Sequence, residues 1–233
     1  GELEIRVKKR TAELTKANEA LQVEITERKQ AEEELKQSMG KLVKATEDTI
    51  QAMAMIVETR DPYTAGHQRR VTQLACAIAK KMGLSKDQTS ALRLAGLIHD
   101  IGKVRVPAEI LTNPDGLSEA EFSIVKMHPL VGYEILKTIE FPWPIAQIVY
   151  QHHERMDGSG YPSGLSGEDI LLEARILAVS DVVEAMASHR PYRPALGIDR
   201  ALLEITQKKG VLYDANVVDT CQWLFTKGSF KFE

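Results

Sequence analysis

The chain has 233 residues, 43% of them hydrophobic, and a formal net charge of −3. This length accommodates one large domain, or a domain with an extension, and the apolar content suffices for a buried core. The weak negative charge excludes a globally basic surface for nucleic-acid polymers. An anionic substrate must therefore meet local positive charge, from metal ions or from an arginine cluster.

No stretch approaches the roughly 20 apolar residues that span a bilayer, and no signal peptide opens the chain. Cys76 and Cys221 lie far apart in apolar segments, which is typical of free thiols in a reducing cytosol. We therefore expect a cytoplasmic protein. Because the chain opens on Gly1 within a helical pattern, we also expect an excised part of a longer protein, whose upstream segments can include a membrane anchor.

Residues 1 to about 60 predict one continuous helix with apolar residues on a heptad. One seam consists of Leu14, Leu21, Leu35, Leu42 and Ile56, and its companion of Ile25, Met39 and Met53. Sustained heptads with flanking charges favour a coiled coil over a solvated single helix. The stretch RTAELTKANEALQVEITERKQAEEEL also resembles linkers that join sensory modules to output domains in bacterial signalling proteins. We expect a coiled-coil linker over 1–47, a parallel homodimer, an upstream sensory domain and a globular domain over 48–233.

From Tyr63 onward the sequence predicts only helices. An amphipathic segment ends at Gly83, and Ser85 with Gln88 forms a capping box for a helix that ends near His99. A second capping box, Ser118 with Glu121, opens a helix that should reach Met127. Further helices are expected from Pro144 to His152, over 171–189, and around 200–207 and 216–225. No segment alternates like a strand, so the predicted fold class is all-α.

Five of the six histidines lie where predicted helices begin or end. The segment YQHHERMDGSGYP at 150–162 places His152 and His153 next to each other before a glycine-rich loop. Neighbouring helical side chains point about 100° apart. The pair is therefore expected to serve either two adjacent metal positions, or one metal and one hydrogen-bond partner. A polar helix end followed by a turn is the plainer alternative, as is a satisfied core position for any single histidine.

The ordered motifs HQRRV, HDIGK, HPLVG, HHERMDGSGYP and ARILAVSDVVEAMASHRPYR, over roughly 48–225, resemble the HD-GYP phosphodiesterases. This resemblance implies an all-α, HD-type helical bundle that hydrolyses cyclic di-GMP to linear pGpG or GMP. It implies metal ligation by His67, His99, Asp100, His128, His152, His153 and Asp181. It also implies nucleotide binding by Arg190 and Arg193.

The residue types suit this chemistry. Two metal ions roughly 3.5–4 Å apart can activate water and clamp the leaving oxygen. Asp100 has two oxygens with which to bridge them, and mixed imidazole and carboxylate ligands favour iron or manganese, with zinc as a third option. Lys103, one turn beyond Asp100, is expected to touch phosphate or to aid the leaving group. Arg70 and Glu154 are expected to orient ligands, and Asp157 to be structural.

Two departures from the family pattern stand out. Ser180 and Glu184 replace the alanine and aspartate of many members, and Tyr63 occupies the position of a glutamate that binds a third metal in some. We therefore expect two metals. An inactive cyclic di-GMP receptor that signals through the coil, and a general HD-domain nucleotide phosphohydrolase, are the competing functions.

Overall fold

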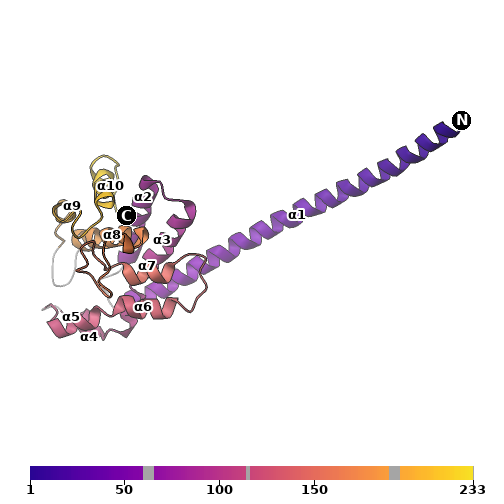
Figure 1. The fold of residues 1–233 in the computed structure, drawn as a ribbon. Helices are drawn as coiled ribbons and strands as arrows, with labels where there is room; N and C mark the ends of the chain where they lie inside the picture. The colour runs from indigo at the N-terminus through magenta and orange to yellow at the C-terminus, as the bar shows by residue number, and fades with distance from the viewer. Residues whose placement is uncertain (60–65, 114–115, 189–194, 233) are drawn as a thin grey trace. The chain divides into compact units, whose positions relative to one another are not determined.

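The structure is a computed structural model, and it describes residues 1–59, 66–113, 116–188 and 195–232. These ranges contain helices and no β-strand (Figure 1), which confirms the all-α prediction. None of the described helices is long and apolar enough to cross a membrane. The α-helices are α1 (Glu2–Glu58), α2 (His67–Met82), α3 (Lys86–Ile98), α4 (Ala108–Leu111), α5 (Glu119–Val125), α6 (His128–Leu136), α7 (Ile145–Gln151), α8 (Leu172–Ala187), α9 (Ile198–Gln207) and α10 (Ala215–Thr226). Two 3₁₀ helices, η1 (Ile101–Arg105) and η2 (Gly167–Asp169), lie between them.

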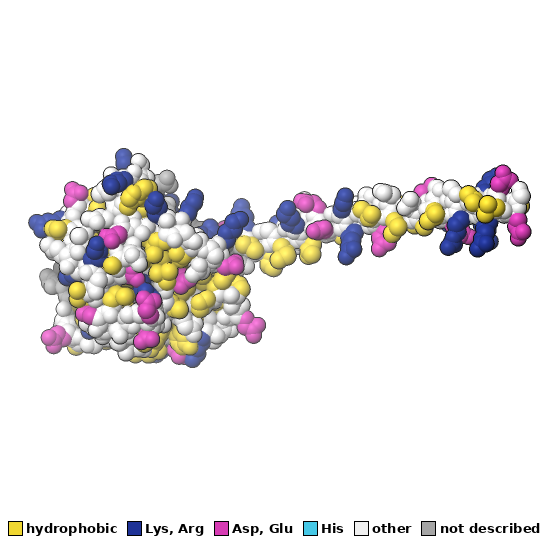
Figure 2. Space-filling view, turned by 45° about the horizontal axis from the view of Figure 1, so that its top comes forward, with side chains coloured by type: hydrophobic (Ala, Val, Ile, Leu, Met, Phe, Trp, Pro, Cys, Tyr) yellow, Lys and Arg dark blue, Asp and Glu magenta, His cyan; other side chains and the backbone are white. Residues whose placement is uncertain are grey.

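The chain divides into two compact units, Gly1–Asp48 and Thr49–Glu233. The first unit consists of the larger part of α1, and its described side chains are all exposed. The exposed positions include the seam residues Leu14, Leu21 and Leu35. Figure 2 shows hydrophobic side chains along this helix between charged ones. A single copy of the chain therefore leaves the heptad seam uncovered.

The second unit is built around α2 and α8. The last turns of α1 bury Ile50, Ala54 and Val57, a spacing that places them on one helix face toward the core. Helix α2 packs against α3, α8 and α10, and α8 also contacts α9 and α10. Because α8 is covered on several sides, its residues are buried almost continuously from Glu173 to Ser180.

The capping signals place the helix ends correctly. Gly83 adopts the left-handed conformation after α2, and the capping boxes of Ser85 with Gln88 and Ser118 with Glu121 both form. The helix predicted to reach Met127 ends earlier, at Val125, and the new helix α6 begins at His128. Pro129 in the first turn of α6 explains the restart, since proline lacks the amide proton that a first helical turn does not use. We did not predict α6.

Gly102 lies in η1, where the backbone contacts α6 without room for a side chain. A Cβ atom at this position would lie 1.9 Å from the carbonyl oxygen of His128 and 2.6 Å from the backbone nitrogen of Gly132. Backbone atoms cannot turn aside as a flexible side chain can, so this contact requires glycine. It holds the end of α3, with His99 and Asp100, against the start of α6.

We expect Gly102→Ala to lower the free energy of unfolding by about 1–3 kcal/mol, because the added methyl group forces η1 and α6 apart. Chemical denaturation followed by circular dichroism measures this change. Gly40→Ala is the control, since it adds the same group to an exposed position of α1 with nothing within 4 Å. A Gly102→Ala protein as stable as the unsubstituted one would contradict the close packing of η1 on α6.

Candidate metal centre

The seven predicted metal ligands converge in the second unit. They come from the starts of α2 and α6, the ends of α3 and α7, and the middle of α8. Their candidate ligand atoms form three groups, and the atoms of each group lie within 4.8 Å of one another. The first group is His128, His152 and His153, and the second is His67, His99 and Asp181. The third, His99, Asp100 and His152, shares a residue with each of the other two. The fold thus brings together all seven residues, and their role as ligands remains a prediction.

Three of the histidines are anchored in the same way. The Nδ1 atom of each ring contacts the carbonyl oxygen three residues earlier, at 2.7 Å for His99, 2.7 Å for His128 and 2.5 Å for His152. A carbonyl oxygen only accepts, so each ring donates its Nδ1 proton. In the neutral ring Nε2 then carries a lone pair, and this is the atom that a metal ion can bind.

Two of these lone pairs face each other. His128 and His152 are buried, and burial lowers the pKa of His128 to about 4 and that of His152 to about 3. At pH 7 neither ring carries a proton on Nε2, yet the two Nε2 atoms lie only 3.3 Å apart. Facing lone pairs repel each other unless a cation lies within reach of both. The residues therefore fit a bound metal ion.

His99 provides a second indication of the same kind. Its Nε2 atom is buried and has no hydrogen-bond partner among the residues that the structure describes. A buried polar atom without a partner is rare in native proteins, and an ion is one of the groups that explains it. Nε2 of His99 is thus a third buried ring nitrogen, besides those of His128 and His152, that a metal ion could satisfy.

The Asp100 carboxylate lies between these histidines. Its Oδ1 atom is 3.4 Å from Nε2 of His128, and its Oδ2 atom is 3.6 Å from Nε2 of His99. Burial opposes ionisation, but the positive charges of Lys103 and of the protonated His67 help to outweigh it, and the pKa of Asp100 lies well below its usual range. The ionised carboxylate presents one oxygen to each side, as a bridging ligand requires. Bridging itself remains a prediction.

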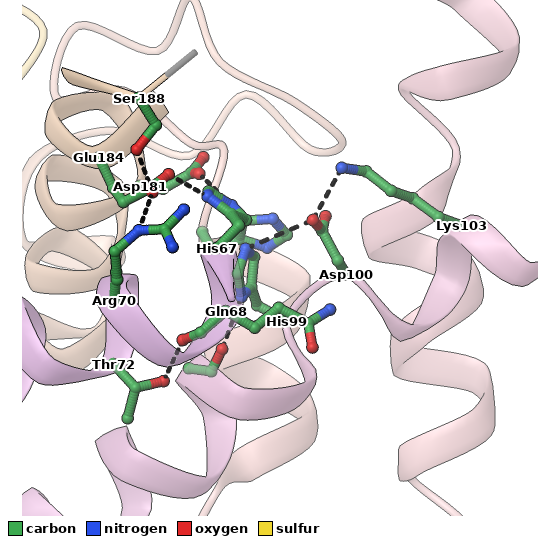
Figure 3. A network of polar contacts seen from close by, with 12 residues as sticks. His67, Gln68, Arg70, Thr72, His99, Asp100, Lys103, Asp181, Glu184 and Ser188 are labelled. Carbon is green, nitrogen blue, oxygen red and sulfur yellow. Dashed lines mark hydrogen bonds and ion pairs between the residues drawn. The ribbon is translucent and has the colours of Figure 1, made fainter. Parts of the chain in front are cut away.

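Lys103 contacts a predicted ligand. Its Nζ atom donates to Oδ2 of Asp100 at 2.7 Å, and its side chain is 15% exposed. The ammonium group therefore balances the buried carboxylate and lies at the margin of the histidine cluster, as Figure 3 shows. Contact of Lys103 with phosphate or a leaving group stays a prediction.

His67 lies between two carboxylates (Figure 3). Its Nε2 atom is 3.2 Å from Oδ1 of Asp181, and its Nδ1 atom contacts Oε2 of Glu184. Burial alone would lower the pKa of His67, but hydrogen bonds to Asp181 and Glu184 raise it to about 9. The ring is thus held as a cation, which is the charge that a metal ion at Nε2 would bring to this position.

Glu184 is a site residue that we missed, since the sequence analysis noted it only as a departure from the family pattern. It is 1% exposed and lies on α8 three residues after Asp181. Residues three apart on a helix share a face, so this spacing was the available signal. Arg70, three residues after His67 on α2, donates from Nε to Oε1 of Glu184 at 2.7 Å. Arg70 therefore acts on His67 through Glu184.

His152 and His153 lie side by side at the end of α7, with ring centroids 4.1 Å apart. Both rings join His128 in one group of candidate ligands, and His152 also joins His99 and Asp100 in another. The expectation that the pair serves two adjacent metal positions, or one metal and one hydrogen-bond partner, stays a prediction. The ring of Tyr161 stacks on His153 at 4.8 Å and fixes its orientation from the loop side.

Glu154 serves the glycine-rich loop, and the expectation that it orients a ligand is not met. Its carboxylate accepts from the backbone nitrogens of Ser163 at 2.8 Å and Leu165 at 3.0 Å. A Cβ atom at Gly160 would lie 2.5 Å from Cα of Glu154, so the loop folds back closely on the histidine pair. Asp157 accepts from Ser159 within the loop at 3.0 Å and 2.7 Å, the structural role that we predicted.

Three residues named in the sequence analysis lie outside the described residues. Two are the predicted nucleotide-binding residues Arg190 and Arg193, and the third is Tyr63. Arg190 and Arg193 follow closely in sequence after α8, which ends at Ala187. Their role stays a prediction.

Comparison with known proteins agrees with these motifs. Residues 51–217 match the family model described as HD domain. Over 190 residues the chain is 40% identical to the cyclic di-GMP phosphodiesterase response regulator RpfG of Xanthomonas campestris pv. campestris, which covers 81% of this chain and 50% of that protein. Over 153 residues it is 40% identical to 3′3′-cGAMP-specific phosphodiesterase 3 of Vibrio cholerae, with 66% and 33% covered. The chain thus spans half the length of these relatives, or less.

A solved structure also shares the fold. The chain resembles Bd1817, an HDG"Y"P protein from Bdellovibrio bacteriovorus, with a TM-score of 0.58 and 21% identity over 68% of this chain and 51% of that one. At this identity the likeness concerns the fold alone. The family model, however, covers most of the chain and all seven predicted ligands. The chain therefore belongs to the HD domain family, and the prediction of an HD-GYP member is confirmed.

Proposed function

We propose that this chain is the output domain of a larger sensory protein and hydrolyses a phosphodiester bond of cyclic di-GMP in a metal-dependent reaction. The observation that carries the proposal is the approach of the Nε2 atoms of His128 and His152 to 3.3 Å, while Nδ1 of each ring donates to a backbone carbonyl oxygen. A cation within reach of both Nε2 atoms would satisfy this pair. The substrate class is supported by two relatives that are named as phosphodiesterases of cyclic dinucleotides.

We infer a centre of two divalent ions. One would take His67, His99 and Asp181, and the other His128, His152 and His153, with Asp100 between them. Mixed imidazole and carboxylate donors favour iron or manganese, with zinc as the third option. When bound, such ions activate water and neutralise charge on the phosphoryl oxygens.

The chain's own residues would bind and orient the dinucleotide. Lys103 is partly exposed beside Asp100, so its ammonium group is within reach of a phosphate that enters the site. Arg190 and Arg193 would hold phosphates or bases, since guanidinium groups fork onto phosphate and stack on rings. We propose linear pGpG as the product. A third metal site would lack its glutamate, because Tyr63 stands at that position.

Turnover of cyclic di-GMP is the direct test of this proposal. Protein purified anaerobically and loaded with iron(II) or manganese(II) should convert cyclic di-GMP to pGpG, as separated by liquid chromatography. The 3′3′-cGAMP relative favours a second candidate substrate, so 3′3′-cGAMP is assayed in parallel. A higher kcat/KM for 3′3′-cGAMP would replace the proposed substrate. Tight binding of cyclic di-GMP without turnover would instead identify a receptor.

Removal of either member of the His99–Asp100 pair should strip metal and abolish hydrolysis. Each of the two residues belongs to a group of three candidate ligands, and its removal leaves that group one ligand short. Elemental analysis of His99→Ala and Asp100→Ala measures bound metal independently of activity. His189→Ala is the control, because it removes the one histidine outside the predicted ligand set. Unchanged metal content in both site variants would defeat the ligand assignment.

Arg190 and Arg193 should contribute to nucleotide affinity and not to metal content. A charge-assisted hydrogen bond to phosphate is worth roughly 1.5–3 kcal/mol, so each alanine variant should weaken binding about ten-fold or more. Calorimetric titration with a cyclic dinucleotide measures this in a protein whose turnover is blocked. An Arg190→Ala, Arg193→Ala double variant with unchanged affinity would show that this segment does not hold the ligand.

We further propose that residues 1–47 form a coiled-coil linker and join two copies of the chain in parallel. The exposed leucine seam of α1 supports this, since seam residues of a coiled coil are buried only by a partner helix. Light scattering at micromolar concentration should show a dimer, and Leu21→Asp with Leu35→Asp should give a monomer. Gln30→Asp with Gln37→Asp is the control, because these exposed positions lie outside both seams of the heptad. A monomeric unsubstituted chain would contradict the proposal.

A further inference from the structure

Glu184 occupies a position that the proposed metal chemistry does not yet use. Its carboxylate is buried between α2 and α8 and accepts from three side chains. Oε2 contacts Nδ1 of His67, while Oε1 accepts from Nε of Arg70 at 2.7 Å and from Oγ of Ser188 at 2.6 Å. Figure 3 shows these four side chains in one continuous network beside Asp181.

His67 differs from the other anchored histidines in the group that holds it. His99, His128 and His152 each donate Nδ1–H to a backbone carbonyl oxygen of their own chain segment. His67 opens its helix and instead contacts a side chain of another helix. Its orientation therefore depends on a group that substitution can remove, whereas the carbonyl anchors of the other rings cannot be removed in this way.

The network also decides which nitrogen of the His67 ring a metal ion can use. A carboxylate only accepts, so Glu184 keeps a proton on Nδ1, and the proton on Nε2 is the one that a metal ion can replace. Arg70 fixes Glu184 from the other side with a positive charge and keeps the buried carboxylate paired. Partners of this kind commonly orient metal-binding histidines.

We propose that Glu184 is a positioning residue that aims Nε2 of His67 at the metal position shared with His99 and Asp181, and that Arg70 holds Glu184 in place. This inference rests on the proposed metal centre. In this role Glu184 contacts neither the substrate nor the metal ion. It orients the His67 ring, whose Nε2 atom would bind the metal ion.

Glu184→Gln separates this role from simple packing. Glutamine has the same shape, but Arg70 only donates and will attract the amide oxygen, which turns the amide NH₂ toward Nδ1 of His67. The ring then has to accept at Nδ1 and carry its proton on Nε2, the wrong atom for a metal. Glu173→Gln is the matched control: the same change on the same helix, at a buried carboxylate that accepts from Gln88 at 3.1 Å.

The experiment is an equilibrium titration of the full chain with manganese(II), in which electron paramagnetic resonance measures the free ion. We expect two sites in the unsubstituted protein and in Glu173→Gln. In Glu184→Gln one site should weaken about 10- to 100-fold while the other is unchanged. Nitrogen-15 resonances of the histidine rings in the metal-free variant should show His67 protonated on Nε2 and not on Nδ1.

Three results would overturn the inference. One is a Glu184→Gln protein that binds both ions as tightly as the unsubstituted chain. Another is equal weakening of both sites together with a lower melting temperature of the metal-free protein, which would reveal a structural role. Absence of manganese binding in the unsubstituted protein would overturn the proposed metal centre and this inference with it.

Discussion

The site depends on one unfavourable contact, the approach of Nε2 of His128 to Nε2 of His152 at 3.3 Å. Each ring donates its Nδ1 proton to a backbone carbonyl oxygen, and burial keeps both rings neutral. Two lone pairs in a dry interior stay this close only because the fold holds them there. The stability of the surrounding helices thus maintains a cluster of donor atoms that could hold a cation.

Close packing between helices holds these histidine rings in place. Gly102 lets η1 lie directly on the backbone of α6, so Asp100 and His128 meet at 3.4 Å. Helix α8 crosses the core and presents Asp181 and Glu184 to the start of α2. The glycine-rich loop closes the remaining side, where Tyr161 stacks on His153. Contacts between different elements therefore bring the predicted ligands together.

This arrangement explains what could be predicted from the sequence. Helix ends carry local signals, such as the capping boxes at Ser85 and Ser118. Predicted ligands lie at other helix ends, with His99 directly after α3 and His128 at the start of α6. The residue types and their order then predict a metal site. The directions of side chains beyond a helix end, as at His153, depend on tertiary contacts. The partnership of His67 with Glu184 joins residues 117 positions apart, and no local pattern encodes it.

The central claim is that two cations complete this set of donors, and anomalous scattering from crystals of anaerobically prepared, metal-loaded protein tests it most directly. The account predicts two peaks at the absorption edge of the loaded metal. One should lie among His67, His99 and Asp181, and the other among His128, His152 and His153, with the carboxylate of Asp100 between them. The absence of any peak within this cluster would contradict the metal centre. Three fully occupied positions would contradict the number of two metal ions.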